Sequence, residues 1–160
     1  MKQTTIKLPP PLLKGRISLE ETIAQRRSIR EYRGEPLSLA QLSQILWSAQ
    51  GITGSREFRA APSAGATYPL EIFVFLGRES VKELEAGIYQ YIVRSHSLRL
   101  HKTGDFRQDL ARAALGQNFI TQAPVNIAIC ALYHRTCDTY GGRGERYVHM
   151  EVGHVGENIH

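Results

Sequence analysis

The clearest hydrophobic pattern in the chain predicts a helix that ends before Gly51. Ser38 and Gln41 form a capping box at its start, in which each side chain can bond the other residue's backbone N–H. Glycine is a natural residue just past a helix end, so Gly51 marks the stop. The apolar positions recur every three or four residues and would share one face of the helix. They are Leu39, Leu42, Ile45, Leu46 and Ala49.

A second capping box, formed by Ser18 and Glu21, predicts a shorter helix that runs to about Arg27. Residues 1–17 before it are expected to be an extended lead-in. Arg26 and Arg27 would fall in the last helical turn, where positive charge suits the helix dipole.

Apolar runs further along the chain predict the strands of a sheet. The runs 72–76 and 87–92, followed by a shorter one at 98–101, predict an antiparallel meander. Residues 125–132 are almost continuously apolar, which is typical of a strand buried on both faces, so we expect this strand near the sheet centre. Residues 51–69 are rich in Gly, Ser, Ala and Pro and predict a loop.

The remaining pattern is helical. Residues 105–115 and 117–122 predict two helices, and residues 135–146 predict a loop that carries Gly and Arg. A last helix begins at about Glu145 and is still running at the final residue. Helices and hairpin-like strands that share one core indicate an α+β fold, a mainly antiparallel sheet flanked by helices, in a single domain over residues 1–160.

Composition indicates a globular chain with a real core. Of its 160 residues 42% are hydrophobic and 22% charged. The longest apolar run has six residues, far short of the about 20 that a membrane helix needs, so no membrane association is expected. The N-terminus lacks the apolar segment of a secretory signal. With only two cysteines, the cytoplasm is the expected compartment. Cys130 lies in an apolar run and is expected to be a buried thiol.

The positive charge is concentrated in one short stretch. The formal net charge is +5, and four arginines fall within the eight residues RRSIREYR at 26–33. Nucleic-acid surfaces usually carry a longer basic stripe or stacking aromatics, so no nucleic-acid partner is expected. A compact cluster suits one or two phosphates, because Arg binds phosphate oxygens in pairs and Ser28 adds a donor. An Arg-rich composition without any ligand explains the same count.

The other candidate chemistries have less support. His149 and His154 are five residues apart, about 140° around a helix, so no metal site is expected. Ser63 lacks the surroundings of a catalytic serine. The small residues at 62–65 would let a flat ring approach the backbone closely. A phosphate cluster with such a loop suits a mononucleotide such as FMN, although both features also occur without ligands.

These motifs together resemble the nitroreductase superfamily of FMN-dependent flavoproteins, with the SagB-type dehydrogenases most similar. The similarity extends over nearly the whole chain, and the pair RRS-x-R and PSAG-x-x-YPLE is the most specific part. The matching stretches are LPPP, SLEETIAQRRSIREYRGEPLSLAQLSQILWSAQGIT, APSAGATYPLEIFVF, GIYQY, GDFRQDLARAALGQ, APVNIAI and RTCDTYGGRGERYVHMEVGHVGENI.

The resemblance implies a three-layer fold and a homodimer with an FMN cofactor at the dimer interface. It also implies that the flavin takes electrons from a nicotinamide donor (NAD(P)H), or from the substrate, and passes them to a small organic acceptor. Transferred to matching positions, it implies a phosphate and ribityl motif at Arg26, Arg27, Ser28 and Arg30. It implies a ring-lining segment at Pro62, Ser63, Ala64 and Gly65. Asn158, on the last helix, matches the family's Gln-Asn pair, which is Glu157-Asn158 here.

Two departures from the family pattern bear on activity. Azole-forming relatives often carry a Lys-Tyr pair before the last helix, and the corresponding pair here is Thr139-Tyr140. Tyr140 is therefore the candidate acid–base residue. The missing Lys puts azoline oxidation in doubt. Family members also continue with a further turn, strand and arm, so the domain is expected to be C-terminally short, to bind FMN weakly or to need a partner. The alternative function is a non-catalytic flavin-fold protein that binds a ligand or partner.

Overall fold

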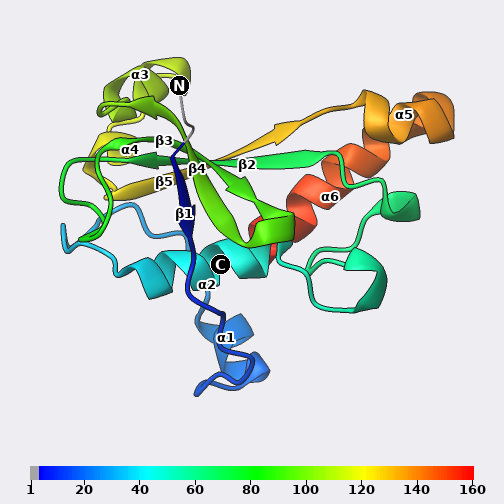
Figure 1. Ribbon diagram of the computed structural model, residues 1–160, viewed down its shortest axis with the longest axis horizontal. Helices are drawn as coiled ribbons and strands as arrows, with labels where there is room; N and C mark the ends of the chain where they lie inside the picture. The colour runs from blue at the N-terminus through cyan, green and yellow to red at the C-terminus, as the bar shows by residue number, and fades with distance from the viewer. Residues whose placement is uncertain (1–3) are drawn as a thin grey trace.

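The structure, a computed structural model, describes residues 4–160; the first three residues of the expected lead-in lie outside the described residues. A five-stranded sheet runs in the order β1-β4-β3-β2-β5 (Figure 1), and every neighbouring pair is antiparallel. The antiparallel α+β prediction is therefore confirmed. The strands are β1 (Thr5–Lys7), β2 (Leu70–Leu76), β3 (Gly87–Ile92), β4 (Ser97–Thr103) and β5 (Val125–Ala131).

Within residues 4–160, six helices and four short 3-10 turns connect and cover the strands. In Figure 1, α2 and α6 lie beneath the sheet, while α3 and α4 gather at the end away from α5. The helices are α1 (Leu19–Gln25), α2 (Leu39–Gln50), α3 (Arg107–Ala113), α4 (Phe119–Gln122), α5 (His134–Tyr140) and α6 (Gly144–Ile159). The turns are η1 (Ser55–Glu57), η2 (Ala64–Ala66), η3 (Val93–Ser95) and η4 (Gly141–Arg143).

The hydrophobic core lies between the sheet and the pair α2 and α6. Alternate residues of β2 point into it and are buried, as the period of two in a strand requires. Leu42 and Leu46 of α2 meet them, together with Val148 and Val155 of α6. Each such side chain contributes about 1.5–3 kcal/mol through the area it removes from water.

The α2 prediction is confirmed in detail. The Ser38 hydroxyl accepts the Gln41 N–H at 3.2 Å, and the Gln41 side chain accepts the Ser38 N–H at 2.8 Å. The helix ends before Gly51, but not because Gly51 is left-handed, since its φ is −60°. Glycine is needed there because a Cβ would lie 2.1 Å from Cδ1 of Trp47.

Four predictions about position were wrong. β5 lies at the edge of the sheet and pairs only with β2 among the described residues, so its apolar run is half-buried and Cys130 is exposed rather than buried. Most of the expected loop 135–146 is helical, in α5 and η4. The arginines are absent from the last turn of α1, because that helix ends at Gln25 and Arg26 is its C-cap.

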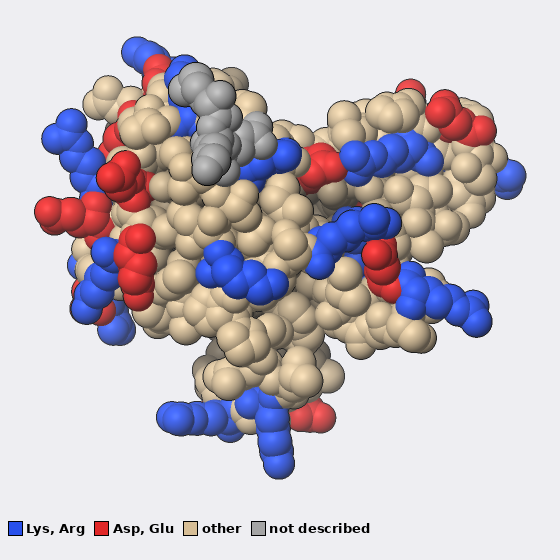
Figure 2. Space-filling view, in the orientation of Figure 1, with Lys and Arg blue, Asp and Glu red and all other residues tan. Residues whose placement is uncertain are grey.

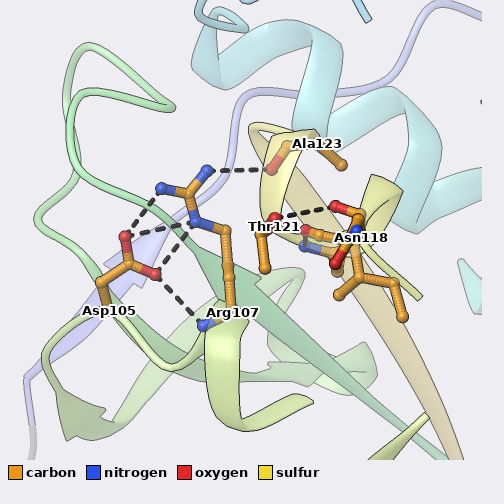
Figure 3. Close-up of polar contacts among 7 residues, drawn as sticks. Asp105, Arg107, Asn118, Thr121 and Ala123 are labelled. Atoms are coloured by element: carbon orange, nitrogen blue, oxygen red, sulfur yellow. Dashed lines mark hydrogen bonds and ion pairs between the residues drawn. The ribbon is translucent and has the colours of Figure 1, made fainter. Parts of the chain in front are cut away.

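The Arg107 side chain joins the start of α3 to the end of α4 (Figure 3). The Arg107 guanidinium donates to Oδ2 of Asp105 at 2.7 Å and to the Ala123 carbonyl at 3.0 Å. Oδ1 of Asp105 also accepts the Arg107 N–H at 3.1 Å. These hydrogen bonds lower the pKa of Asp105, because they favour its charged form. Asp105 thus accepts the N–H of the first residue of α3, although Phe106 is the N-cap of that helix.

Candidate functional site

The segment 62–68 forms a tight turn at one end of the sheet. Three of its residues have left-handed backbone: Gly65 (φ +58°), Ala66 (φ +53°) and Tyr68 (φ +45°). Such conformations are costly for residues with a Cβ and persist where neighbouring contacts hold them. Here the Ser63 hydroxyl accepts the Tyr68 N–H at 2.9 Å and closes the turn.

The turn faces the middle of α6 across a cavity of about 230 Å³. Three of the sequence-predicted ring-lining residues, Pro62, Ser63 and Ala64, form one wall. The opposite wall comes from Tyr147, Met150, Glu151 and His154. The small residues and the aromatic and thioether groups give this cavity flat apolar surfaces, while the carboxyl and imidazole groups supply polar ones.

The fourth ring-lining candidate, Gly65, lies against the catalytic candidate Tyr140. A Cβ at Gly65 would be 2.6 Å from the Tyr140 hydroxyl oxygen, so only glycine leaves room for that hydroxyl. The Tyr140 ring packs edge-on against Tyr147 at 5.1 Å between ring centres. The fold therefore brings Tyr140, at the end of α5, to the turn whose other residues line the cavity.

The arginine motif lies elsewhere in the same chain. In Figure 1, α1 protrudes at the bottom of the view, well away from η2 at the right. Arg27 is exposed and donates to the carbonyls of Ala24 and Arg26. Arg30 reaches toward α4, with its guanidinium 5.8 Å from the centre of the Phe119 ring. Ser28 is exposed. Within residues 4–160 the two motifs do not share this cavity.

Asn158 is also outside the cavity. It is exposed in the last turn of α6, one turn beyond His154, which is a rise of about 6 Å along the helix.

Glu151 is the site residue that the sequence prediction missed. The residue is 2% exposed and lies on the buried stripe of α6. Burial raises its pKa, while hydrogen bonds from Ser63 and Gln50 and the charge of Arg59 act in the opposite direction. One signal was available: Glu151 lies three residues after Val148 and four before Val155, on a face that is otherwise apolar.

A larger cavity, of about 560 Å³, opens between the sheet and the part that carries α5, where Figure 2 shows a hollow flanked by both signs of charge. Its charged side chains are largely paired: Arg135 bonds Glu71 at 2.7 Å and Arg94 bonds Glu57 at 3.0 Å. Over the face in Figure 2 basic side chains are scattered among acidic ones, unlike the continuous stripe of a nucleic-acid surface.

In the described part of the chain no three His, Cys, Asp or Glu side chains lie close enough together to hold a metal ion. His149 instead bonds the Tyr133 hydroxyl at 2.9 Å, and His154 lines the small cavity. None of the helices within residues 4–160 has the length and apolar character to cross a membrane.

Comparison with known proteins decides the family. The sequence model of the nitroreductase family matches residues 23–160. The chain belongs to the nitroreductase family. A family member from Methanocaldococcus jannaschii, provisionally named a nitroreductase, is 49% identical over 144 residues, which are 90% of this chain and 72% of that protein. Membership in the nitroreductase family supports an oxidoreductase.

Solved structures and a processing protein agree with the assignment to the nitroreductase family. A crystal structure from Ralstonia eutropha, provisionally named a nitroreductase, superposes with a TM-score of 0.81 at 30% identity and covers 97% of this chain and 69% of that one. The microcin B17-processing protein of Escherichia coli is 30% identical over 104 residues, 62% of this chain and 38% of that protein. The SagB-type resemblance is thus confirmed at the level of homology.

Proposed function

We propose that the chain is an FMN-dependent oxidoreductase that passes hydride between a nicotinamide nucleotide, or the substrate itself, and a small organic acceptor. The observation that carries this proposal is the small-residue turn 62–65, which lines a cavity against α6 and adjoins the Tyr140 hydroxyl. Bound flavin supplies the hydride chemistry, so the protein needs few acid–base groups of its own.

The residues present fit a flavin if two copies of the chain form the site. The turn and Met150 offer apolar surface to a ring, and the exposed Arg27 and Ser28 offer donors to a phosphate. A cavity of about 230 Å³ is smaller than the roughly 300–1,000 Å³ of a site that encloses such a ligand. A homodimer in which one copy contributes the turn and the other the arginines explains both facts.

Exposed apolar side chains support the homodimer. They cluster on α1 and the segments beside it, and α1 itself buries no residue. Neighbouring exposed apolar side chains commonly mark an interface. They are Leu12, Leu13, Ile17, Leu19, Ile23 and Ile29.

In this proposal the chain's own residues bind, orient and move one proton. Tyr140 is placed to donate or accept a proton at its hydroxyl beside Gly65. Gly65 keeps that position open, and the small side chains of Ala64 and Ser63 let a ring approach the backbone. The second candidate function, a non-catalytic flavin-fold binding protein, is favoured by the separation of the arginines from the cavity.

The first experiment is the absorption spectrum of the purified protein before and after FMN is added and the sample is gel-filtered. Flavin bands that co-elute with the protein at one FMN per chain support the proposal. A colourless protein that keeps no added FMN contradicts it. A steady-state assay with NADH or NADPH and a quinone then separates the enzyme from the non-catalytic alternative, which binds FMN without turnover.

A further inference from the structure

The short helix α5 carries two side chains that contact the turn 62–68. Thr136 and Tyr140 are four residues apart in this helix, so they lie on the same side of it. The Tyr140 hydroxyl lies against Gly65. The Thr136 hydroxyl lies 2.8 Å from that of Thr67, and Thr136 is 1% exposed. The helix therefore meets the turn at two points, one a buried polar contact and the other the candidate catalytic residue.

The direction of the buried contact follows from the protons available. The Thr67 hydroxyl donates to the Ala64 carbonyl at 3.0 Å, and a hydroxyl has only one proton to donate. The Thr136 hydroxyl must therefore donate to the Thr67 oxygen. The backbone N–H of Thr67 donates to the same Ala64 carbonyl at 3.2 Å. A chain of hydrogen bonds thus runs from α5 through Thr67 to Ala64, which lines the small cavity.

Arg135, the neighbour of Thr136 in α5, makes a second contact with the same turn. Its Nη1 donates to the Tyr68 carbonyl at 3.1 Å, and its Nη2 lies 2.7 Å from Oε1 of Glu71 in β2. The guanidinium therefore joins α5 to the backbone at the end of the turn and to the strand that follows it. Two successive residues of α5 thus hold two successive residues of the turn, Thr67 and Tyr68.

These contacts meet the turn where its backbone is strained. Thr67 has an ordinary helical backbone, with a φ of −75°, and stands between Ala66 and Tyr68, which have positive φ. Non-glycine residues keep such a conformation where neighbouring contacts hold it. Because α5 has only seven residues, it is too short to be stable alone. The turn and the helix therefore fix each other, and the place of the Tyr140 hydroxyl depends on the contacts between them.

We propose that Thr136 is a positioning residue that acts through Thr67 to hold the Tyr140 hydroxyl against Gly65. The inference rests on the proposed function for the proton that Tyr140 moves, and on the hydrogen bonds between α5 and the turn for the position of that hydroxyl. Thr136 itself needs no contact with flavin or substrate. Its hydroxyl fixes how α5 lies along the turn, and Tyr140, one helical turn further on, takes its place accordingly.

The test compares Thr136→Val with Thr136→Ser in the full chain. Valine has nearly the shape of threonine but no hydroxyl, whereas serine keeps the hydroxyl. Thr121→Val is the matched control, because it removes a threonine hydroxyl that bonds the Asn118 carbonyl at 2.7 Å in the region of α4, at the end of the molecule away from α5 (Figure 1). Circular dichroism and the thermal midpoint show that each variant is folded.

Two measurements follow Tyr140 itself. In protein labelled with ¹³C at the tyrosine Cζ atoms, the NMR signal of Tyr140 is identified by its loss in Tyr140→Phe. The position of this signal reports the surroundings of the hydroxyl without any ligand. In the FMN-loaded protein, steady-state kinetics with NADH and a quinone give kcat and KM separately.

We expect Thr136→Val to shift the Tyr140 signal and to lower kcat by about tenfold with KM unchanged, since misplacing a reacting group by about 1 Å can cost about 100-fold. FMN affinity should stay within about threefold of wild type, because Thr67 keeps its hydrogen bonds to the Ala64 carbonyl. Thr136→Ser and Thr121→Val should leave the signal in place and kcat within about threefold. In a Tyr140→Phe background, Thr136→Val should lower kcat no further, because the hydroxyl that it positions is gone.

Three results overturn the inference. The first is an unmoved Tyr140 signal in the folded Thr136→Val protein. The second is a further loss of kcat when Thr136→Val is added to Tyr140→Phe, which would mean that Thr136 acts independently of that hydroxyl. The third is a Thr136→Ser protein as impaired as Thr136→Val, which would mean that the hydroxyl is not the group that matters.

A second variant keeps the test decisive if Thr136→Val does not fold. Thr67→Val removes the other hydroxyl of the pair at a half-buried position and should shift the same Tyr140 signal, and an unmoved signal there also overturns the inference. A wild-type chain that binds no FMN or shows no turnover contradicts the proposed function instead. The Tyr140 signal then decides by itself whether Thr136 holds the hydroxyl in place.

Discussion

The Arg107 guanidinium occupies the space that a side chain at Gly77 would need. An added Cβ at Gly77 would lie 2.0 Å from Cζ of Arg107. The guanidinium cannot simply swing away, because it is bonded to the Asp105 carboxylate and the Ala123 carbonyl (Figure 3). A glycine after β2 therefore permits the contact between that strand and the start of α3.

Gly77→Ala should destabilise the protein by about 1–3 kcal/mol, the cost of losing charge-assisted hydrogen bonds in a half-buried place. Urea unfolding measures the loss. Gly153→Ala is the matched control, since nothing lies within 4 Å of a Cβ at Gly153, and should stabilise α6 by up to about 1 kcal/mol. If Gly77→Ala costs the same in an Arg107→Ala background, the guanidinium is not the cause.

Acid should weaken the fold through His96. Its Nδ1 bonds the Tyr91 hydroxyl and its Nε2 bonds the Pro9 carbonyl, at 2.8 and 2.9 Å, and Ser43 bonds the same carbonyl at 2.6 Å. Burial lowers the pKa of His96, opposed by the Pro9 bond, while the charge of Lys7 lowers it further. The folded state therefore favours neutral imidazole more than the unfolded state does.

The sign of the effect follows from linkage. The stability that neutral His96 provides is complete above the unfolded-state pKa of about 6.5 and is lost as the pH falls below it toward the lower folded-state value. Urea unfolding at a series of pH values from about 7.5 to 5 should show this decline. His96→Gln should flatten the curve over that range, and a curve with an unchanged slope would assign the decline to other groups.

Tyr140→Phe should separate chemistry from binding. The substitution keeps the ring that packs against Tyr147 and removes only the hydroxyl beside Gly65. If Tyr140 moves the proton, kcat should fall by about 100-fold or more while FMN affinity stays unchanged. Rapid-reaction kinetics of the reductive and oxidative half-reactions would locate the loss. Equal rates in variant and wild type would remove Tyr140 from the mechanism.

Mixing two inactive variants would test the shared site. Arg26→Ala/Arg27→Ala should lose FMN with the fold intact, and Ala64→Glu should lose it by filling the ring-lining turn. If each site takes arginines from one copy and the turn from the other, a mixed dimer has one intact site. Refolding an equal mixture should then recover about a quarter of the wild-type FMN content. No recovery in mixtures that do form dimers would place both motifs of a site in one copy.

The sequence predicted an element best where residues close together in the chain determine its structure. The Ser38 capping box defined α2 because its hydrogen bonds join residues three apart. The order of strands depends on distant pairing, so the apolar run of β5 did not reveal its edge position. Likewise α5 depends on close packing against α6, where a Cβ at Gly144 would lie 2.7 Å from Cα of Cys137.

The sequence marked the turn 62–65 of the candidate site but gave no prediction for Glu151, which is buried behind it. The structure brings Gly65 against the Tyr140 hydroxyl and places Pro62, Ser63 and Ala64 in the wall of the neighbouring cavity, and their roles at a flavin stay a prediction. Glu151 was missed because its burial depends on packing beside Gln50, which lies 101 positions away along the chain. A contact between residues so far apart in the chain cannot be read from the sequence of one helix.

The short, exposed helix α1 cannot be stable by itself. It has seven residues and buries none of them, and isolated helices shorter than about 12–15 residues are marginal in water. Its order must therefore depend on what covers Leu19 and Ile23, which are 71% and 65% exposed. If a second copy covers these side chains, amide protection in α1 would rise with protein concentration. Amide exchange in this helix would then report the association of two copies.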